Sequence, residues 1–218
     1  MSFNFCCPKN LVDLKSETLS SGGRFYLLPS GKKVPSVTTV MGAMKKDAIL
    51  AWRKRVGEEE ANKISRKASS RGTNVHSLCE AYIKGEIISS RDNMPDALEM
   101  FYSIKNEIDS VNNIHYMEQS LWSEQLGLAG RVDLIAEYKG TLSVIDFKTS
   151  KKIKSSEEIE DYFWQTCAYA LMYEELVGSP IDQLVIIMAV ENEKPLIFIE
   201  ETEKHITGLL HAIRKYHI

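Results

Sequence analysis

The stretch "VIDFKTS", Val144 to Ser150, places an aspartate and a lysine two residues apart at the end of an apolar strand. Side chains alternate between the two faces of a strand, so Asp146 and Lys148 point to the same face. A strand that turns polar on one face is either an exposed edge with an ion pair or part of a functional site. Taken alone, the stretch favours the exposed edge.

The composition is typical of a single soluble globular domain. The chain has 218 residues, of which 44% are hydrophobic and 26% are charged. Its four cysteines have neither zinc-site spacing nor the grouping of an iron–sulfur cluster, and scattered thiols suit a reducing cytosol. No apolar run reaches the roughly 18 residues of a membrane span, and the N-terminus has no signal-peptide core. We therefore expect a cytoplasmic protein without an iron–sulfur cluster or a membrane anchor.

Positive charge is concentrated in two places, although the formal net charge is −3. From Lys45 to Arg71 there are nine lysines and arginines against four acidic residues, and four more lysines lie between 148 and 154. Basic clusters on an acidic chain indicate a track for a polyanion. A solvated helix face is the alternative, and it is the commoner reason for such a charge run.

The pattern of elements indicates an α/β domain. A hairpin is expected in "GGRFYLLPSGKKVPSV". Ser36 is expected to cap a short helix through Met44, and Asp47 a longer one through residue 68. Further helices are expected from Gly72 to Ile83 and from Pro95. Then follow strands at 114–124, 128–138 and 141–149, a helix at 156–178, strands at 183–190 and 195–200, and a helix from Thr202.

A second aspartate, Asp133 in "GLAGRVDLIAEY", precedes Asp146 by thirteen residues. Lys139 and Gly140 predict a tight turn between their strands, which can bring both carboxylates to one end of the sheet. A divalent cation such as Mg²⁺ or Mn²⁺ needs this arrangement of oxygen ligands. Gly130 allows either a close backbone approach or a bulge. A hairpin with one aspartate on each strand and no metal is the alternative.

The stretch "RGTNVHSLCEAYI" contributes a histidine and a glutamate to one helix face. His76 and Glu80 are four residues apart, and the polar Arg71–Thr73 segment is expected to begin the helix. A single histidine on a helix is usually a core or surface residue. The position of His76 one turn into the helix, beside Arg71 and Thr73, favours a functional role.

A polar amide interrupts the apolar stripe of "DYFWQTCAYALMYEE". Gln165 shares a helix face with Tyr162 and Met172 by three- and four-residue spacing. A buried amide needs a hydrogen-bond partner. Lys148 on the preceding strand, or a phosphate, would supply one.

The motifs "RGTNVH", "GRVD", "IDFKT" and "YFWQTCAYA", in that order, resemble the PD-(D/E)xK nuclease superfamily in its RecB-like exonuclease branch. The resemblance covers roughly residues 70 to 190. Upstream, "VPSVTTVMG" and "AWRKRVGEEEANKIS" look like the leading segments of phage and mitochondrial exonucleases and extend the match to about Val34. It implies a restriction-endonuclease-like α/β core, a mixed central sheet flanked by helices in the order αβββαβ, with an N-terminal helical extension.

The resemblance also implies domain limits and residue roles. Residues 1–218 would form a single nuclease domain, with a helical DNA-guiding segment at 34–70 and a catalytic core at 71–200. Mg²⁺ or Mn²⁺ would be bound by His76, Asp133, Asp146 and the backbone carbonyl of Phe147. Catalysis would rest on Asp133, Asp146, Lys148 and Gln165, with Glu80 holding a metal-bound water. The expected substrate-binding residues are Trp52, Arg53, Arg55, Arg71, Thr73, Lys151 and Tyr162.

The implied activity is phosphodiester hydrolysis by a DNA exonuclease on single strands or DNA ends, in replication, recombination or repair. The cell would be a bacterium or a phage-infected host, and the chain would act as a monomer. One alternative is a structure-specific endonuclease on the same core, and another is a nucleic-acid-binding protein that does not cleave. The basic segment with Trp52, which is suited to base stacking, favours the guiding of a strand. Digestion polarity and the choice between DNA and RNA stay open.

Overall fold

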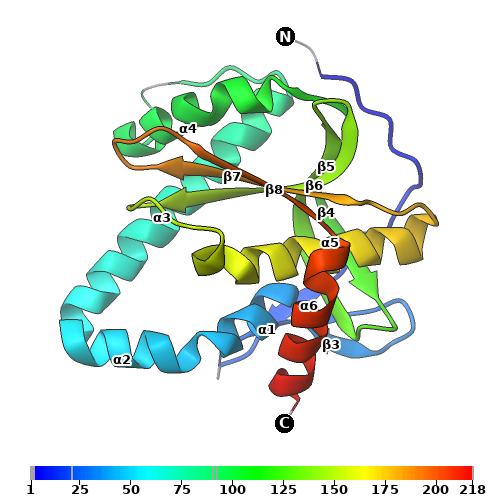
Figure 1. Ribbon diagram of the computed structural model, residues 1–218, viewed down its shortest axis with the longest axis horizontal. Helices are drawn as coiled ribbons and strands as arrows, with labels where there is room; N and C mark the ends of the chain where they lie inside the picture. The colour runs from blue at the N-terminus through cyan, green and yellow to red at the C-terminus, as the bar shows by residue number, and fades with distance from the viewer. Residues whose placement is uncertain (1–2, 21, 90, 92, 218) are drawn as a thin grey trace.

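The computed structural model describes residues 3–20, 22–89, 91 and 93–217. Its centre is a mixed sheet of five strands in the order β4–β5–β6–β7–β8 (Figure 1). The strands β4, β5 and β6 form an antiparallel meander, β7 lies parallel to β6, and β8 returns antiparallel to β7. Their bounds are Val111–Ser123, Leu128–Tyr138, Thr141–Ser150, Gln183–Val190 and Leu196–Glu201.

Helices cover both faces of this sheet (Figure 1). The helices α1 (Val37–Met44), α5 (Glu160–Val177) and α6 (Glu203–Tyr216) pack on one face, and α3 (Glu58–Ile83) and α4 (Pro95–Ile108) on the other. Along β6, Val144 belongs to the first core cluster, while Ile145 and Phe147 belong to the second. The order αβββαβ and the expected alternation along this strand are therefore confirmed.

The N-terminal region forms a small sheet of its own. The expected hairpin is present as β2 (Arg24–Leu27) and β3 (Lys33–Pro35), and β1 (Ser16–Thr18), which the sequence did not predict, pairs with β2. Ser36 caps α1 as expected, because its Oγ accepts a hydrogen bond from the Thr39 backbone amide at 3.0 Å.

The predicted helix boundaries between residues 46 and 83 were wrong. The helix α2 (Lys46–Val56) follows Lys45, and Asp47 lies in its first turn instead of capping it. The chain then breaks at Gly57, which has a φ of +91°, a conformation that favours glycine. From Glu58 a single helix of 26 residues runs through Gly72. His76 therefore lies about five turns into α3, instead of one turn.

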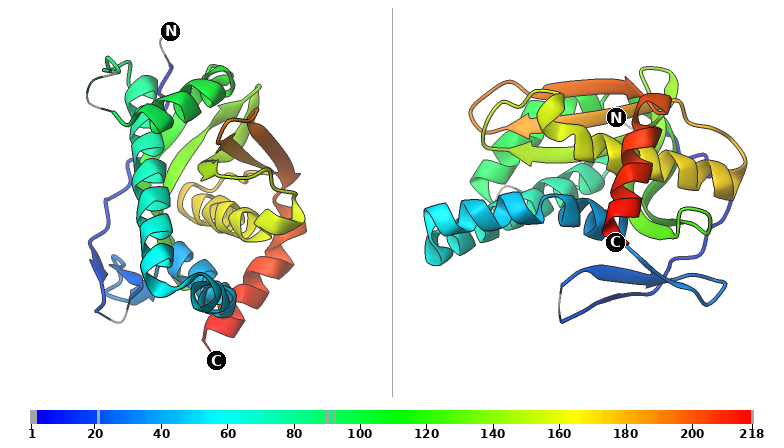
Figure 2. Two further views of the ribbon diagram at one scale, coloured as in Figure 1. Left: turned by 90° about the vertical axis from the view of Figure 1, so that its left-hand side faces the viewer. Right: turned by 60° about the horizontal axis from the view of Figure 1, so that its bottom comes forward.

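Residues 46–70, here called the helical arm, consist of α2 and the first half of α3 and project from the body (Figures 1 and 2). Every residue of α2 is at least partly exposed, and of residues 58–70, all of which the structure describes, Ala61 alone is buried. Arg53 joins the two helices by donating to Glu58 and to Asn62. The arm coincides with much of the predicted DNA-guiding segment, whose role stays a prediction.

No helix in the described part of the chain is both long enough and apolar enough to cross a membrane.

The role of Gly130 can be tested through stability. A Cβ atom at this position would lie 2.7 Å from the hydroxyl oxygen and 2.8 Å from Cε1 of Tyr169, a buried side chain of α5. We expect Gly130→Ala to lower the free energy of unfolding by about 1–3 kcal/mol through overpacking. Denaturant unfolding measures this. Gly42→Ala is the control, because its Cβ meets nothing within 4 Å on α1, so it should stabilise by up to about 1 kcal/mol. Equal stabilities would contradict the close approach.

Candidate active site

The strands β5 and β6 separate at the two predicted aspartates. Their ladder runs from the pair Tyr138–Thr141 to the pair Leu134–Ile145. Beyond that pair, β5 stays paired with β4 and β6 with β7. Asp133 and Asp146 are the next residues on each strand, so they lie where the sheet opens. We call this place the β5–β6 fork.

The Asp133 side chain supplies a hydrogen bond where the β5–β6 ladder has ended. Beyond the end of the β5–β6 ladder, the backbone amide of Phe147 donates to the side-chain oxygen Oδ2 of Asp133 at 2.9 Å. The same oxygen is 3.4 Å from Nδ1 of His76, which α3 brings over the strand end. The expected proximity of His76 to Asp133 is thus present in the structure.

The charges of His76 and Asp133 stabilise each other. Burial lowers the pKa of His76, but the Asp133 carboxylate outweighs it and the net pKa is about 9. Burial by itself raises the pKa of Asp133, but the facing His76 imidazole holds that pKa below its ordinary value. The fork therefore favours a negative charge on Asp133 and a positive charge beside it.

Asp146 and Lys148 form a buried ion pair. The Asp146 side chain is 2% exposed and contacts the Lys148 ammonium through Oδ2, and its Oδ1 accepts a hydrogen bond from Gln165 Nε2 at 3.0 Å. Burial raises the pKa of Asp146 to about 6, although Lys148 opposes this rise. Gln165 was expected to meet Lys148 or a phosphate. Its partner is instead Asp146, because α5 packs over the face of β6 from which both charged side chains project.

Tyr162 gathers positive charge beside this pair. The ammonium groups of Lys45, Lys148 and Lys154 lie 5.0, 5.1 and 5.3 Å from the centre of its ring. These distances suit cation–π attraction. Lys45 is also paired with the Asp161 carboxylate at 2.7 Å, so part of this positive charge is balanced.

Glu118 joins the site, and sequence reasoning missed it. It lies on β4 with a φ of +49°, between the pairs Met117–Leu134 and Gln119–Val132, so it faces Asp133 across the ladder. Burial raises the pKa of its carboxyl to about 7. A lone glutamate in a strand is not a signal by itself. Only the β4–β5 register places it opposite Asp133.

His76, Glu118 and Asp133 form a candidate site for a divalent cation. One ligand atom of each lies within 4.8 Å of the others. Two carboxylates and an imidazole suit Mg²⁺ or Mn²⁺. Asp146 is not part of this group, because Lys148 and Gln165 hold its carboxylate. Metal binding by Asp146 and by the Phe147 carbonyl stays a prediction.

A cavity of about 450 Å³ opens onto this group, and Thr73 and Glu80 also line it. Glu80 forms an ion pair with Lys84 at 2.5 Å, and its expected role in holding a metal-bound water stays a prediction. Because the cavity reaches the three candidate ligands, a small molecule or ion can approach them from solvent.

The remaining predicted residues do not line the cavity at the candidate metal ligands. Arg71 is 5% exposed and donates to Glu191 Oε2 at 2.8 Å, so it joins α3 to the end of β7. Its predicted contact with the substrate stays a prediction. Trp52 is partly buried and Arg55 is exposed, both on α2, and Lys151 is exposed after β6.

The comparison with protein families agrees with this geometry. The profile described as the PD-(D/E)XK nuclease superfamily matches residues 47–215. The chain belongs to this superfamily. The match includes all of the helical arm except Lys46, and every residue at the fork.

Two curated relatives are the mitochondrial genome maintenance exonuclease 1 of Homo sapiens and that of Mus musculus. The human protein is 28% identical over 130 residues, which cover 56% of this chain and 38% of the relative. The mouse protein is 27% identical over 153 residues, which cover 64% and 44%. The matched region thus spans less than half of either relative.

A solved structure also resembles the chain. It is that of a candidate exonuclease from Eubacterium rectale, with a TM-score of 0.47 and 15% sequence identity, and the match covers 68% of this chain and 64% of that one.

Glu118 can be tested by metal binding. Removing its charge in Glu118→Gln should weaken Mn²⁺ binding at least about tenfold, because one of the candidate oxygen ligands is lost. Titration calorimetry measures the affinity. Glu193→Gln, a substitution on the exposed turn after β7, is the control and should bind Mn²⁺ like the wild type. An unchanged affinity in Glu118→Gln would remove this residue from the site.

Proposed function

We propose that the protein is a metal-dependent DNA exonuclease that hydrolyses phosphodiester bonds in single strands or at DNA ends. The observation that carries this proposal is the convergence of Asp133, Asp146 and Lys148 at the β5–β6 fork, with His76 and Glu118 beside them. Membership of the nuclease superfamily and the names of the two curated relatives support it.

The side chains at the fork suit this reaction. A divalent cation, when bound, neutralises phosphate charge and makes water a better nucleophile. His76, Glu118 and Asp133 would hold it, and Asp146, which lies at the same fork, would take part. Mg²⁺ and Mn²⁺ are the proposed ions, since carboxylates dominate the donor set.

Lys148 supplies a positive charge where negative charge develops in the transition state. Its ammonium is fixed by Asp146, and Asp146 is fixed in turn by Gln165. The Lys148 side chain is 18% exposed, so it can still meet a substrate or a water molecule. Gln165 is thus a positioning residue that acts through Asp146.

The helical arm favours an exonuclease over the endonuclease alternative. Figure 2 shows the arm projecting from the body, and one cavity is lined both by Lys46, Ile49 and Leu50 of the arm and by His76. A strand passing between the arm and the body would have to enter by its free end. The alternative of a non-cleaving binding protein has less support, because His76, Asp133, Asp146 and Lys148 are all present.

The cellular setting is part of the proposal. We place the enzyme in the cytoplasm of a bacterium or of a phage-infected host, acting as a monomer in replication, recombination or repair. The exposed basic residues of the arm, together with Lys151 after β6, would contact DNA phosphates.

End-labelled DNA tests the proposal. With Mg²⁺ or Mn²⁺, linear single strands should be shortened progressively to oligonucleotides, while a closed single-stranded circle should survive. Excess chelator should abolish the activity, because the fork then lacks its cation. Rapid nicking of the circle would favour the endonuclease, and full activity in chelator would reject the metal-dependent mechanism.

Substitutions at the fork should separate binding from chemistry. Asp133→Asn, Asp146→Asn and Lys148→Ala should each lower the turnover number by about a hundredfold or more, while DNA affinity changes little. Single-turnover cleavage and fluorescence anisotropy measure the two quantities. Lys194→Ala, in the exposed turn before β8, is the control. Cleavage by Lys148→Ala at the wild-type rate would reject the role of the lysine.

A further inference from the structure

A large cavity separates the helical arm from the N-terminal sheet and leads to the fork. Its volume is about 980 Å³, and Lys46, Ile49 and Leu50 of α2 line it on the arm side. On the other side it shares Arg24, Thr73 and His76 with the smaller cavity at the candidate metal ligands. We call this space the arm cavity. It adjoins the smaller cavity at the proposed active site.

The arm presents apolar side chains to this space. Ile49 is 45% and Leu50 is 54% exposed. Together with Lys46 they occupy positions i, i+3 and i+4, which lie on one face of a helix. Single exposed apolar residues are common on protein surfaces. Here two adjacent ones share a cavity with His76, so a ligand that passes to the fork meets both.

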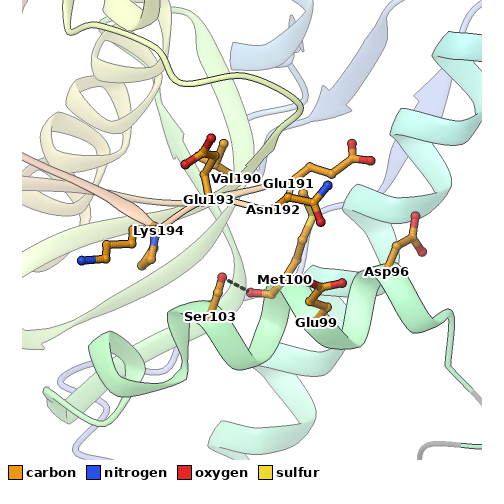
Figure 3. Close-up of a pocket in the computed structure, with 10 residues that line it drawn as sticks. Asp96, Glu99, Met100, Ser103, Val190, Glu191, Asn192, Glu193 and Lys194 are labelled. Atoms are coloured by element: carbon orange, nitrogen blue, oxygen red, sulfur yellow. Dashed lines mark hydrogen bonds between the residues drawn. The ribbon is translucent and has the colours of Figure 1, made fainter.

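The charges around the arm cavity suit a polyanion. None of its described lining residues is acidic, and neither Arg24 nor Lys46 forms an ion pair with a carboxylate of the described residues. Figure 3 shows a contrasting cavity of about 610 Å³ between α4 and the turn after β7. Four acidic residues line that one, Asp96, Glu99, Glu191 and Glu193. A nucleic acid strand would therefore be repelled there and accepted in the arm cavity.

We propose that Ile49 and Leu50 form an apolar wall for the unpaired bases of the substrate strand, while Arg24 and Lys46 contact its phosphates. This inference rests on the proposed function and names the residues that select the substrate. A single strand exposes the faces of its bases, which can bury apolar surface against the two side chains. A duplex hides these faces in its stack.

The wall makes no distinction between sequences. Aliphatic side chains carry no hydrogen-bonding groups that could read base edges. The two arginines first expected to guide the strand are less suited to this role. Arg53 is bound to Glu58 and Asn62. Arg55 lies on the face of α2 opposite Lys46, because nine residues make two and a half turns.

Strands that lack bases test the wall directly. The probes are a labelled single-stranded oligonucleotide and the same strand with consecutive abasic sites in its middle. Anisotropy in Ca²⁺ gives the affinity of the complete chain for each. The wild type should bind the base-bearing strand about tenfold more tightly, which corresponds to about 1.4 kcal/mol. In Ile49→Ser/Leu50→Ser this ratio should fall to about one or two.

Two further variants control this experiment. Ile64→Ser removes an apolar side chain of similar exposure, 42%, from the part of the arm outside the cavity, and should keep the tenfold ratio. Arg24→Ala should weaken both strands equally and reduce the salt dependence of binding, since it removes a phosphate contact. If the double variant melts at a lower temperature, Leu50→Ala replaces it, with an expected ratio between those of the wild type and the double variant.

The outcomes separate this inference from the proposed function. The proposal that Ile49 and Leu50 contact bases is rejected if the wild type binds both strands equally. It is also rejected if the double variant keeps the tenfold ratio, and both results count even if DNA is cleaved. A wild type that prefers the base-bearing strand but cleaves no DNA with Mg²⁺ or Mn²⁺ supports the wall and overturns the exonuclease. In cleavage assays the double variant should raise KM and leave kcat nearly unchanged, because the wall lies outside the reacting centre.

Discussion

The separation of β5 from β6 is the constraint on which the candidate site depends. A continuous ladder would satisfy the Phe147 amide with a backbone carbonyl, and it would leave no room between the strands. Because the ladder ends at the pair Leu134–Ile145, the amide takes the Asp133 carboxylate instead. A buried amide without a partner is costly, so this hydrogen bond fixes the position of the carboxylate. The opened sheet thus supplies both the space for a substrate and an oriented oxygen ligand.

The second constraint is the burial of charge at the same place. An isolated buried carboxylate or ammonium ion is strongly destabilising, whereas a paired one is tolerated. Asp146 has Lys148 and Gln165 as partners, and Asp133 has His76 and the Phe147 amide. Each of the two carboxylates is therefore held by two contacts from different elements. Such a site is oriented before any substrate arrives, which reduces the reorganisation that catalysis would otherwise need.

The helical arm, in contrast to the fork, is thinly packed. It has few buried side chains, and the hydrogen bonds of Arg53 to Glu58 and Asn62 join its two helices. Few buried contacts imply low local stability, which is common where a surface accepts a ligand. The rigid fork and the thinly packed arm face each other across the arm cavity. The densely bonded site and the exposed surface beside it are thus built from different parts of one chain.

The sequence by itself determined the element order from the helix at Pro95 onward, the alternation along β6 and the meeting of His76 with Asp133 and of Asp146 with Lys148, because these follow from local periodicity and from motifs. It did not determine the break at Gly57, since Gly57 and Gly72 are equally plausible breaks until packing is known. Contacts between side chains of distant segments also could not be predicted from the sequence. The register of β4 places Glu118 opposite Asp133. The packing of α5 brings Gln165 into hydrogen-bond contact with Asp146. Glu191, just after β7, pairs with Arg71. These partners are far apart in the chain, so only the tertiary structure, which brings distant segments into contact, could decide them.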